Sequence, residues 1–348
     1  MTFLDAAERE FNPYSIYTDP VGHWVVTVVA MFLLLFVLLT ATAYVVYMER
    51  VLIGRIQLRP GPNRVGPFGL LQLAADGVKM AFKESFIPKG VDLFTYILAP
   101  VIAVVAALMT WAVVPLPIWG GIGYWVANVN IGILVIFAIS GLNVYSIMLA
   151  GYSSNSKYSL LGGLRAAAQL ISYEMSLGLS LVPTFIIVGS LRLQDIMNYQ
   201  AHWGWYNGPI PLLLLTPVGF VIYFISAVAE TNRAPFDLPE AEQELVGGFH
   251  TEYSGFKFLL FYLAEYMNII AVSAVATVLF LGGGAGPIFP GVIWFMAKII
   301  LFLFVYIWIR STWPRLRYDM LMFLGWKVLL PLALANVIIT AVVFVAVQ

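Results

Sequence analysis

The chain of 348 residues contains no cysteine, and only 10% of its residues are charged. Without cysteine it can form no disulfide, supply no thiolate and ligate no iron–sulfur cluster. Its 18 basic and 18 acidic residues give a formal net charge of zero, which argues against nucleic-acid binding. The three histidines, His23, His202 and His250, lie outside the apolar runs. The sequence therefore predicts neither a haem within a membrane nor a metal site.

A basic N-terminal region is also missing. The first 20 residues are polar and acidic, so we expect no cleavable signal peptide.

Apolar residues dominate what is present. They make up 61% of the chain, and the mean hydropathy is +0.91, which is typical of a multispanning membrane protein. A spanning helix needs about 20 apolar residues. We predict an all-α polytopic membrane protein in which residues 1–348 form a single membrane domain with eight transmembrane helices. The predicted spans are 24–47, 93–114, 128–150, 158–189, 210–230, 256–281, 288–310 and 328–347.

Basic residues are distributed unevenly between the connections. Fifteen of the 18 lie in or beside the connections between spans 1–2, 3–4, 5–6 and 7–8. The positive-inside rule places these connections in the cytoplasm and both termini on the outer side. The predicted cytoplasmic loops are 48–92, 151–157, 231–255 and 311–327. We expect a bacterial inner membrane, or a mitochondrial inner membrane if the chain is organellar.

The first cytoplasmic loop has an unusual pattern. A stiff turn at 60–63 precedes Pro67, which suits the first position of a helix. Beyond it, polar residues recur at helical spacing on one face and apolar residues on the other. The polar stripe is Gln72, Asp76, Lys79 and Lys83. This pattern predicts an amphipathic helix lying in the membrane interface. A surface anchor and a gating or binding element both fit that helix.

A third of the acidic residues are concentrated in the stretch 229–255. These six are Glu230, Asp237, Glu240, Glu242, Glu244 and Glu252. Glu240 and Glu244 are four residues apart, so their like charges repel on one helix face. The stretch fits either a solvated loop with a capping aspartate or the entrance of a proton pathway.

Several ionisable residues fall within or at the ends of apolar runs. Glu174, Glu265 and Lys298 are the only charged residues of the apolar runs 166–189, 258–281 and 288–309 respectively, and Glu49 and Glu230 close spans 1 and 5. A charge in a bilayer costs at least about 2.5–3.5 kcal/mol, so it persists when it is paired, neutralised or functional. Structural ion pairs, for example Lys298 with Glu174 or Glu265, are one explanation. A proton relay from the acidic loop to mid-membrane is the other.

Five stretches together resemble one family over nearly the whole chain. They are YMERVLIGRIQLRPGPNRVGPFGLLQ, SNSKYSLLGGLRAAAQLISYEMSLGLS, AETNRAPFDLPEAEQELVGGFHTEYSG, FYLAEYMNII and FLFVYIWIRSTWPRLRYDMLMFLGWKVLLPL. The resemblance is to the family of NADH dehydrogenase subunit 1, which includes the bacterial H subunit, a membrane component of the proton-pumping NADH:quinone oxidoreductase of respiratory complex I. The chain departs from the family pattern at 51–53 and at Ser159, and neither departure touches a charged position.

The resemblance implies a role without a redox centre of its own. Quinone is the implied substrate, entering between span 1, span 6 and the amphipathic helix. FMN and Fe–S clusters are implied in partner subunits: hydrophilic subunits on the cytoplasmic face and small membrane subunits alongside. The implied proton relay is Glu174, Glu230, Asp237, Glu240, Glu242, Glu244, Glu252 and Glu265, to which Lys298 is added from its place in span 7. The implied quinone-side residues are Glu49, Arg50, Arg59, Asp76 and Glu84.

Three other interpretations account for part of these features. A stand-alone proton-coupled transporter explains the intramembrane carboxylates, but it predicts paired broken helices in two halves, which the sequence does not show. A structural membrane anchor explains the spans and leaves the buried charges unexplained. The equivalent subunit of a related energy-converting oxidoreductase shares much of the pattern without needing a quinone site.

Overall fold

The computed structural model describes residues 20–119, 122–124, 126–201, 211–238, 247–286 and 291–347, and helices account for most of them. The elements in chain order are α2 (Pro20–Ile56), η2 (Pro67–Gly69), α3 (Gln72–Phe82), α4 (Leu93–Val113), β1 (Leu116–Trp119), β2 (Ile122–Tyr124), α5 (Gly132–Ser153), α6 (Lys157–Val188), α7 (Leu193–Ala201), α8 (Leu212–Leu215), α9 (Pro217–Glu230), η3 (Gly248–His250), α11 (Phe256–Leu281), α12 (Gly291–Thr312), α13 (Tyr318–Phe323), the π-helical turn η4 (Leu324–Leu329) and α14 (Leu330–Val347). The predicted all-α class is confirmed, with one antiparallel hairpin, β1–β2, as the only pairing of strands among the described residues.

Seven helices in the described part of the chain are long and apolar enough to cross a membrane. They are Met31–Ile56, Leu93–Val113, Gly132–Ser153, Lys157–Val188, Phe256–Leu281, Gly291–Thr312 and Tyr318–Ala346. The run predicted as span 210–230 differs, because the helix breaks at Thr216 before Pro217, leaving α8 and the 14-residue α9. Proline disfavours helical geometry in the residue before it, which accounts for this break.

The long helix α6 shows how local sequence sets a helix end. It runs for 32 residues with Pro183 inside it and stops at Gly189, which adopts a left-handed conformation with φ of 74°. The Gly189 N–H donates to the Phe185 carbonyl at 2.8 Å, closing the last turn. Glycine takes this conformation without steric cost, so it is a common helix terminator.

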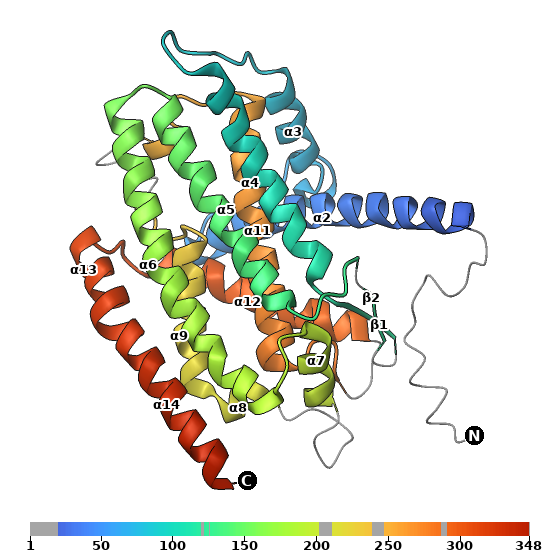
Figure 1. Ribbon diagram of the computed structural model, residues 1–348. Coiled ribbons are helices and arrows are strands. Elements are labelled where there is room, and N and C mark those ends of the chain that lie inside the picture. Colours follow the sequence, from blue (N-terminus) through green and yellow to red (C-terminus); the bar gives the residue numbers. More distant parts are fainter. Residues whose placement is uncertain are drawn as a thin grey trace.

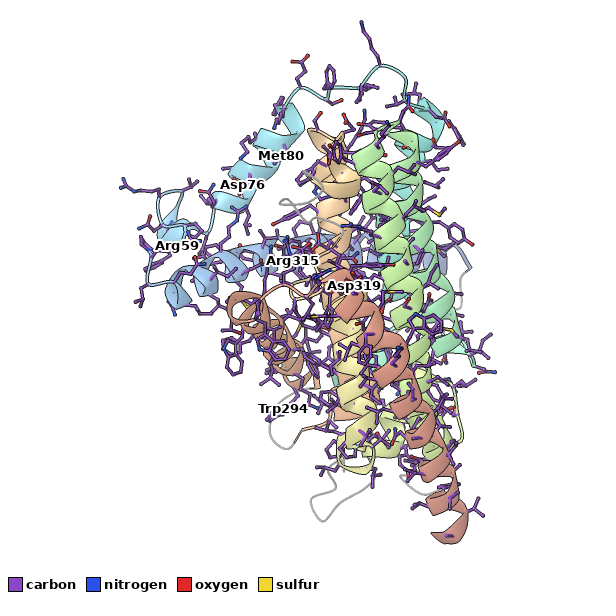
Figure 2. The ribbon with its side chains drawn as sticks, turned by 90° about the vertical axis from the view of Figure 1, so that its left-hand side faces the viewer. Arg59, Asp76, Met80, Trp294, Arg315 and Asp319 are labelled. Atoms are coloured by element: carbon purple, nitrogen blue, oxygen red, sulfur yellow. The ribbon has the colours of Figure 1, made fainter. Side chains whose placement is uncertain are left out.

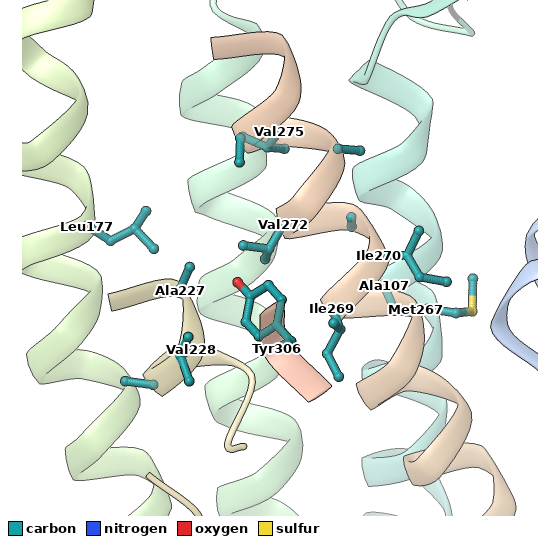
Figure 3. Close-up of a cluster of buried hydrophobic side chains, with 14 of the residues drawn as sticks. Ala107, Leu177, Ala227, Val228, Met267, Ile269, Ile270, Val272, Val275 and Tyr306 are labelled. Carbon is teal, nitrogen blue, oxygen red and sulfur yellow. The ribbon is translucent and has the colours of Figure 1, made fainter. Parts of the chain in front are cut away.

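Helix α11 forms the centre of the molecule. In its span 61% of the residues are buried, against 11% for the span that contains α14. It packs against α4, α12 and α2. Figure 3 shows part of this core, in which Met267, Ile270 and Val272 of α11 lie near Ala107 of α4 and Tyr306 of α12.

The helices alternate in direction between two ends of the bundle. In Figure 1 the α5–α6 turn and the start of α11 lie at the upper end, whereas the β1–β2 hairpin, α7, α8 and the C-terminal end of α14 lie at the lower end. Helix α2 runs crosswise to the others, and its N-terminal half projects from the bundle. Phe32, Leu33 and Phe36 on that half are more than 60% exposed. Such an apolar surface fits lipid or a neighbouring membrane subunit.

The segment predicted as one amphipathic helix has two parts. Phe68 and Gly69 adopt positive φ angles, 54° and 78°, which end η2 before α3 begins at Gln72. No residue of α3 is buried, and its Val78 and Phe82 are 57% and 86% exposed. The helix therefore presents apolar side chains outward rather than to the protein core.

Candidate functional site

Five side chains from four parts of the chain meet in a buried ionic cluster, called here the Glu49 cluster: Glu49, Arg233, Glu265, Tyr266 and Arg310. The Glu49 carboxylate, which is 9% exposed, accepts hydrogen bonds from Arg310, from Arg233 Nη1 at 3.3 Å and from the Tyr266 hydroxyl at 2.7 Å. Arg233 Nε forms an ion pair with Glu265 Oε1 at 2.7 Å. The guanidinium carbon of Arg233 also lies 4.2 Å from the centre of the Tyr266 ring.

Arg233 reaches the cluster because the chain turns sharply after α9. Asn232 adopts a positive φ of 51°, a conformation that asparagine tolerates better than most residues. The Phe236 N–H donates to the Arg233 carbonyl at 2.8 Å, which closes the next turn. Gln169 of α6 holds both sides of this turn, donating to the carbonyls of Ala229 and Phe236, each at 2.8 Å.

The charges of the cluster balance, since two arginines face two carboxylates. Burial by itself disfavours the charged form of Arg233, but Glu265, Tyr266 and Glu49 outweigh it and raise the pKa of Arg233 well above its usual value. A neutral arrangement of paired charges limits the cost of burying them. Removing any one of the four charged members leaves the cluster with one uncompensated charge.

A second ionic contact ties α3 to the C-terminal end of α2. Arg50, which follows Glu49 on α2, donates to Asp76 of α3, and Gln72 donates to the other oxygen of Asp76 at 3.0 Å. Partial burial opposes the charge of Asp76, but the hydrogen bonds from Arg50 and Gln72 prevail and lower its pKa below the usual value of 3.8. Glu49 and Arg50, adjacent in sequence, thus serve the interior cluster and the α3 contact respectively.

The other residues implied on the quinone side lie outside these contacts. Arg59 is exposed, and its side chain donates a hydrogen bond to Gln57 Oε1 at 2.8 Å. In Figure 2 it lies at the outer edge of the molecule, beyond Asp76 of α3. Glu84 is exposed in the segment after α3. Within the described chain, no hydrogen bond or ion pair joins Arg59 or Glu84 to the Glu49 cluster.

Glu174 and Glu230 lie near the same serine. The Ser140 hydroxyl of α5 donates to the Phe137 carbonyl at 3.0 Å and lies 3.3 Å from Glu174 Oε1. Ser140 and Glu230 line the same small cavity. The like charges of Glu174 and Glu230 are close enough to repel each other, which favours a single proton on the pair.

Two small cavities connect these groups to the Glu49 cluster. The first cavity, of about 40 Å³, is lined by Glu230, Glu265, His250, Tyr262, Asn143 and Asn268 among others. The second cavity, of about 30 Å³, is lined by Ser140, Glu230, Tyr223 and Asn268 with apolar residues around them. A water molecule needs about 10–15 Å³ and two to four polar partners, so each cavity can hold water.

The acidic loop is described only in part. Asp237 accepts a hydrogen bond from Arg315 Nη2 at 3.0 Å, which ties the loop to the segment before α13. The backbone carbonyl of Glu252 accepts from the Tyr96 hydroxyl at 2.7 Å. Glu240, Glu242 and Glu244 lie outside the described residues.

Lys298 lies apart from the carboxylates. Its ammonium donates three hydrogen bonds to the carbonyls of Leu281, Gly283 and Ala285, at 2.6, 2.8 and 2.9 Å. These carbonyls belong to the C-terminal end of α11 and the turn after it. Among the described residues, no ion pair joins Lys298 to Glu174 or Glu265, and cations are favoured at such a helix end.

Several polar residues of this region carry little signal in the sequence. Tyr262 and Tyr266 are four residues apart on one face of α11, and their hydroxyl oxygens lie 2.9 Å from each other. Tyr262 comes three residues before Glu265, and Tyr266 comes directly after it. In the sequence, Arg310 is one positive charge among the many near the connections. Ser140, Asn143 and Asn268 carry no charge in otherwise apolar spans, so only their polarity could have drawn attention to them.

Fold and site together define a polytopic helical membrane protein with a buried, charge-balanced cluster, from which two small cavities lead to further carboxyls. A family model described as NADH dehydrogenase matches residues 29–341. The chain belongs to this family.

Curated relatives agree over most of the chain. The H subunit of NADH-quinone oxidoreductase from Protochlamydia amoebophila is 50% identical over 308 residues, covering 87% of this chain and 92% of that protein. The H 1 subunit of the same enzyme from Geobacter metallireducens is 52% identical over 313 residues, covering 88% and 93%. The H subunit from Rhodospirillum centenum is 50% identical over 337 residues, covering 95% and 97%.

Proposed function

We propose that this chain is the membrane subunit of a proton-pumping NADH:quinone oxidoreductase that lines the quinone-access chamber and carries protons on buried carboxyls. FMN and Fe–S clusters reside in partner subunits, and hydrophilic partners dock on the cytoplasmic face. In this proposal α8 and α9 together make the eighth crossing. Helix α3 lies in the cytoplasmic interface of a bacterial inner membrane, with its exposed Val78 and Phe82 in the lipid.

One observation carries the proposal: polar contacts and small cavities alternate from α3 into the middle of the bundle. Asp76 contacts Arg50, whose neighbour Glu49 bonds to Arg233 and Tyr266, and Arg233 pairs with Glu265. The first cavity then joins Glu265 to Glu230, the second cavity joins Glu230 to Ser140, and the Ser140 hydroxyl lies 3.3 Å from Glu174 Oε1. A purely structural set of ion pairs has no need for cavities between its members.

The chemistry requires both ends of this path. Reduction of a quinone to a quinol takes two electrons, which partner subunits supply, and two protons. The apolar surface of α2 and the α3 contact suit an isoprenoid tail entering from the bilayer. A charge change near Arg50 or Glu49 alters the balance of the Glu49 cluster, and the nearest remaining carboxyl, Glu265, responds by binding or releasing a proton.

The relay is tested with Glu174→Gln, Glu265→Gln and the double variant in the assembled complex. We expect each to assemble, to keep NADH oxidation by an artificial acceptor, and to lose quinone-coupled turnover and proton movement by at least about tenfold. Asp319→Asn is the matched control, since Asp319 pairs with Arg317 on the surface and its side chain is 74% exposed. Wild-type coupled activity in the double variant would favour the structural ion-pair explanation. Purification in mild detergent tests the partners, because a stand-alone transporter predicts no stable association with Fe–S subunits.

A further inference from the structure

Asn268 lies where the two cavities meet. It and Glu230 line both the first and the second cavity, whereas Glu265 lines the first and Ser140 the second. Asn268 follows Glu265 by three residues on α11, so both side chains point from the same helix face. Figure 3 shows Val272 and Val275, further along α11 in the same direction, near Leu177 of α6; all three line the second cavity.

Asn268 is only partly buried, and its side-chain amide makes no hydrogen bond to the described protein groups, although it faces two cavities from the most buried spanning helix. A polar group that faces a cavity and has no protein partner can be satisfied by ordered water there. An asparagine amide offers two donors and one acceptor, enough to hold water on both sides of itself. The cavities on those sides measure about 40 and 30 Å³, which leaves space for roughly two or three waters in each.

We propose that Asn268 is a positioning residue that orders a continuous file of water between Glu265 and Ser140, past Glu230. The inference rests on the proposed function. It adds to that function a neutral amide that links the water of the two cavities, which the carboxyls alone do not do. In one transfer a protonated Glu265 releases a proton to the nearest water, and the water beside Glu230 gives one to that carboxylate. The net change is one proton moved, with the waters and the Asn268 amide returned to their starting state.

Other amides of this region separate the role of Asn268 from that of a generic polar residue. Asn143 of α5 lines the first cavity only, so its loss should leave the second cavity connected to Glu230. Asn336 of α14 has a buried amide nitrogen and lies beside Gly219, away from both cavities. Asn336→Leu is therefore the matched control for removing a buried amide from a spanning helix.

The experiment uses the assembled complex in proteoliposomes. Quinone-coupled turnover, proton movement and the solvent deuterium isotope effect are measured for Asn268→Leu, Asn268→Ser and Asn336→Leu. Leucine matches asparagine in size but bonds no water, so we expect coupled turnover to fall by at least about tenfold and its isotope effect to change. Serine keeps a hydroxyl and adds room for one more water, so it should restore at least about a third of the activity. Asn336→Leu should behave as wild type.

Two results would overturn the inference. One is wild-type coupled turnover and an unchanged isotope effect in Asn268→Leu. The other is an equal loss in the leucine and serine variants that is matched by loss of assembled complex, which assigns Asn268 a packing role. If Asn268→Leu does not assemble, the serine variant provides the test: a changed solvent isotope effect supports the inference, and an unchanged one contradicts it. If coupled turnover is unchanged in Asn268→Leu but reduced in Glu265→Gln, this inference alone is overturned. If coupled turnover is unchanged in both variants, the proposed function is overturned.

Discussion

Arg233 and Glu265 form an ion pair of 2.7 Å in the interior of the bundle, although one follows α9 and the other lies inside α11. The pair is completed by Glu49, to which Arg233 also donates. Three elements that are distant in sequence are thereby fixed to one another at a single guanidinium. A planar guanidinium with several donors suits this task, and an ammonium does not.

Removal of Arg233 should therefore damage the structure before it affects the reaction. Arg233→Ala leaves Glu49 and Glu265 without their shared partner, and breaking one side of a buried ion pair costs about 3–5 kcal/mol. We expect less assembled complex and a lower melting temperature, with Arg233→Lys only partly better. Arg317→Ala is the control, because that side chain is 77% exposed in its pair with Asp319. Normal assembly of Arg233→Ala would mean that protonation of a carboxyl compensates for the missing arginine.

The Arg50–Asp76 contact makes a prediction about quinone access. Arg50→Asp and Asp76→Arg should each raise the apparent KM for quinone about two- to fivefold, since a partly exposed ion pair contributes about 0.2–1 kcal/mol. The double exchange should restore KM towards wild type. NADH oxidation by an artificial acceptor serves as the control and should not change. If both activities fall together, Arg50 supports assembly rather than the quinone path.

The same contact predicts where pH has no effect. The pKa of Asp76 is lowered from 3.8, so the stabilisation from its charge is fully present above that value and is lost only as pH falls through the lower, folded-state pKa. The apparent KM for quinone should therefore show no titration of this contact between about pH 6 and 8. Asp76→Asn should reproduce at neutral pH the loss that acid alone would cause. A wild-type KM that rises between about pH 8 and 6, with no such rise in Asp76→Asn, would contradict this assignment.

Lys298 should behave as a helix-end cap rather than as a member of the relay. Lys298→Met removes three hydrogen bonds to the carbonyls of residues 281–285, and hydrogen bonds from a charged group contribute about 1.5–3 kcal/mol each. We expect lower thermal stability but nearly normal turnover per assembled complex. The effects of Lys298→Met and Glu174→Gln should add, because groups without shared partners do not couple. If the stability changes of the two variants are strongly non-additive, the explanation of an ion pair between Lys298 and Glu174 would be favoured again.

Most of the spanning helices could be predicted from the sequence, whereas the break at Thr216 and the partners of the buried charges could not. Apolar runs of about 20 residues predict spanning helices because the bilayer sets that length. Glu174 and Glu265 could be singled out because isolated charges in such runs are costly. The pairing of Arg233 with Glu49, 184 positions away in sequence, could not be predicted because it depends on how the helices pack. Lys298 shows the same limit, since the backbone carbonyls that it binds leave no mark in the sequence.

Close packing around one glycine can be tested against a matched glycine in open space. A Cβ added at Gly162 of α6 would lie 2.8 Å from the Gly248 Cα, and backbone cannot yield easily. Gly162→Ala should destabilise the complex by about 1–3 kcal/mol and disturb the end of the acidic loop. Gly77→Ala meets nothing within 4 Å and should leave stability unchanged or slightly higher. Equal melting temperatures for the two variants would show that α6 and the loop separate easily.

The orientation in the membrane can be measured directly because the chain has no cysteine to remove. Tyr152 and Ile131 lie at opposite ends of α5 and are 66% and 50% exposed. The distribution of basic residues predicts that Tyr152 is cytoplasmic and that Ile131 is on the outer side. An impermeant maleimide added to intact cells should label Ile131→Cys, and it should label Tyr152→Cys only after the membrane is opened. A tag after the C-terminus should be accessible from the same side as Ile131, because α14 ends at the lower end of the bundle in Figure 1; a tag on the N-terminus should also be outside. The opposite labelling pattern would place the acidic loop outside, and the proton path proposed above would then have to run in the reverse direction.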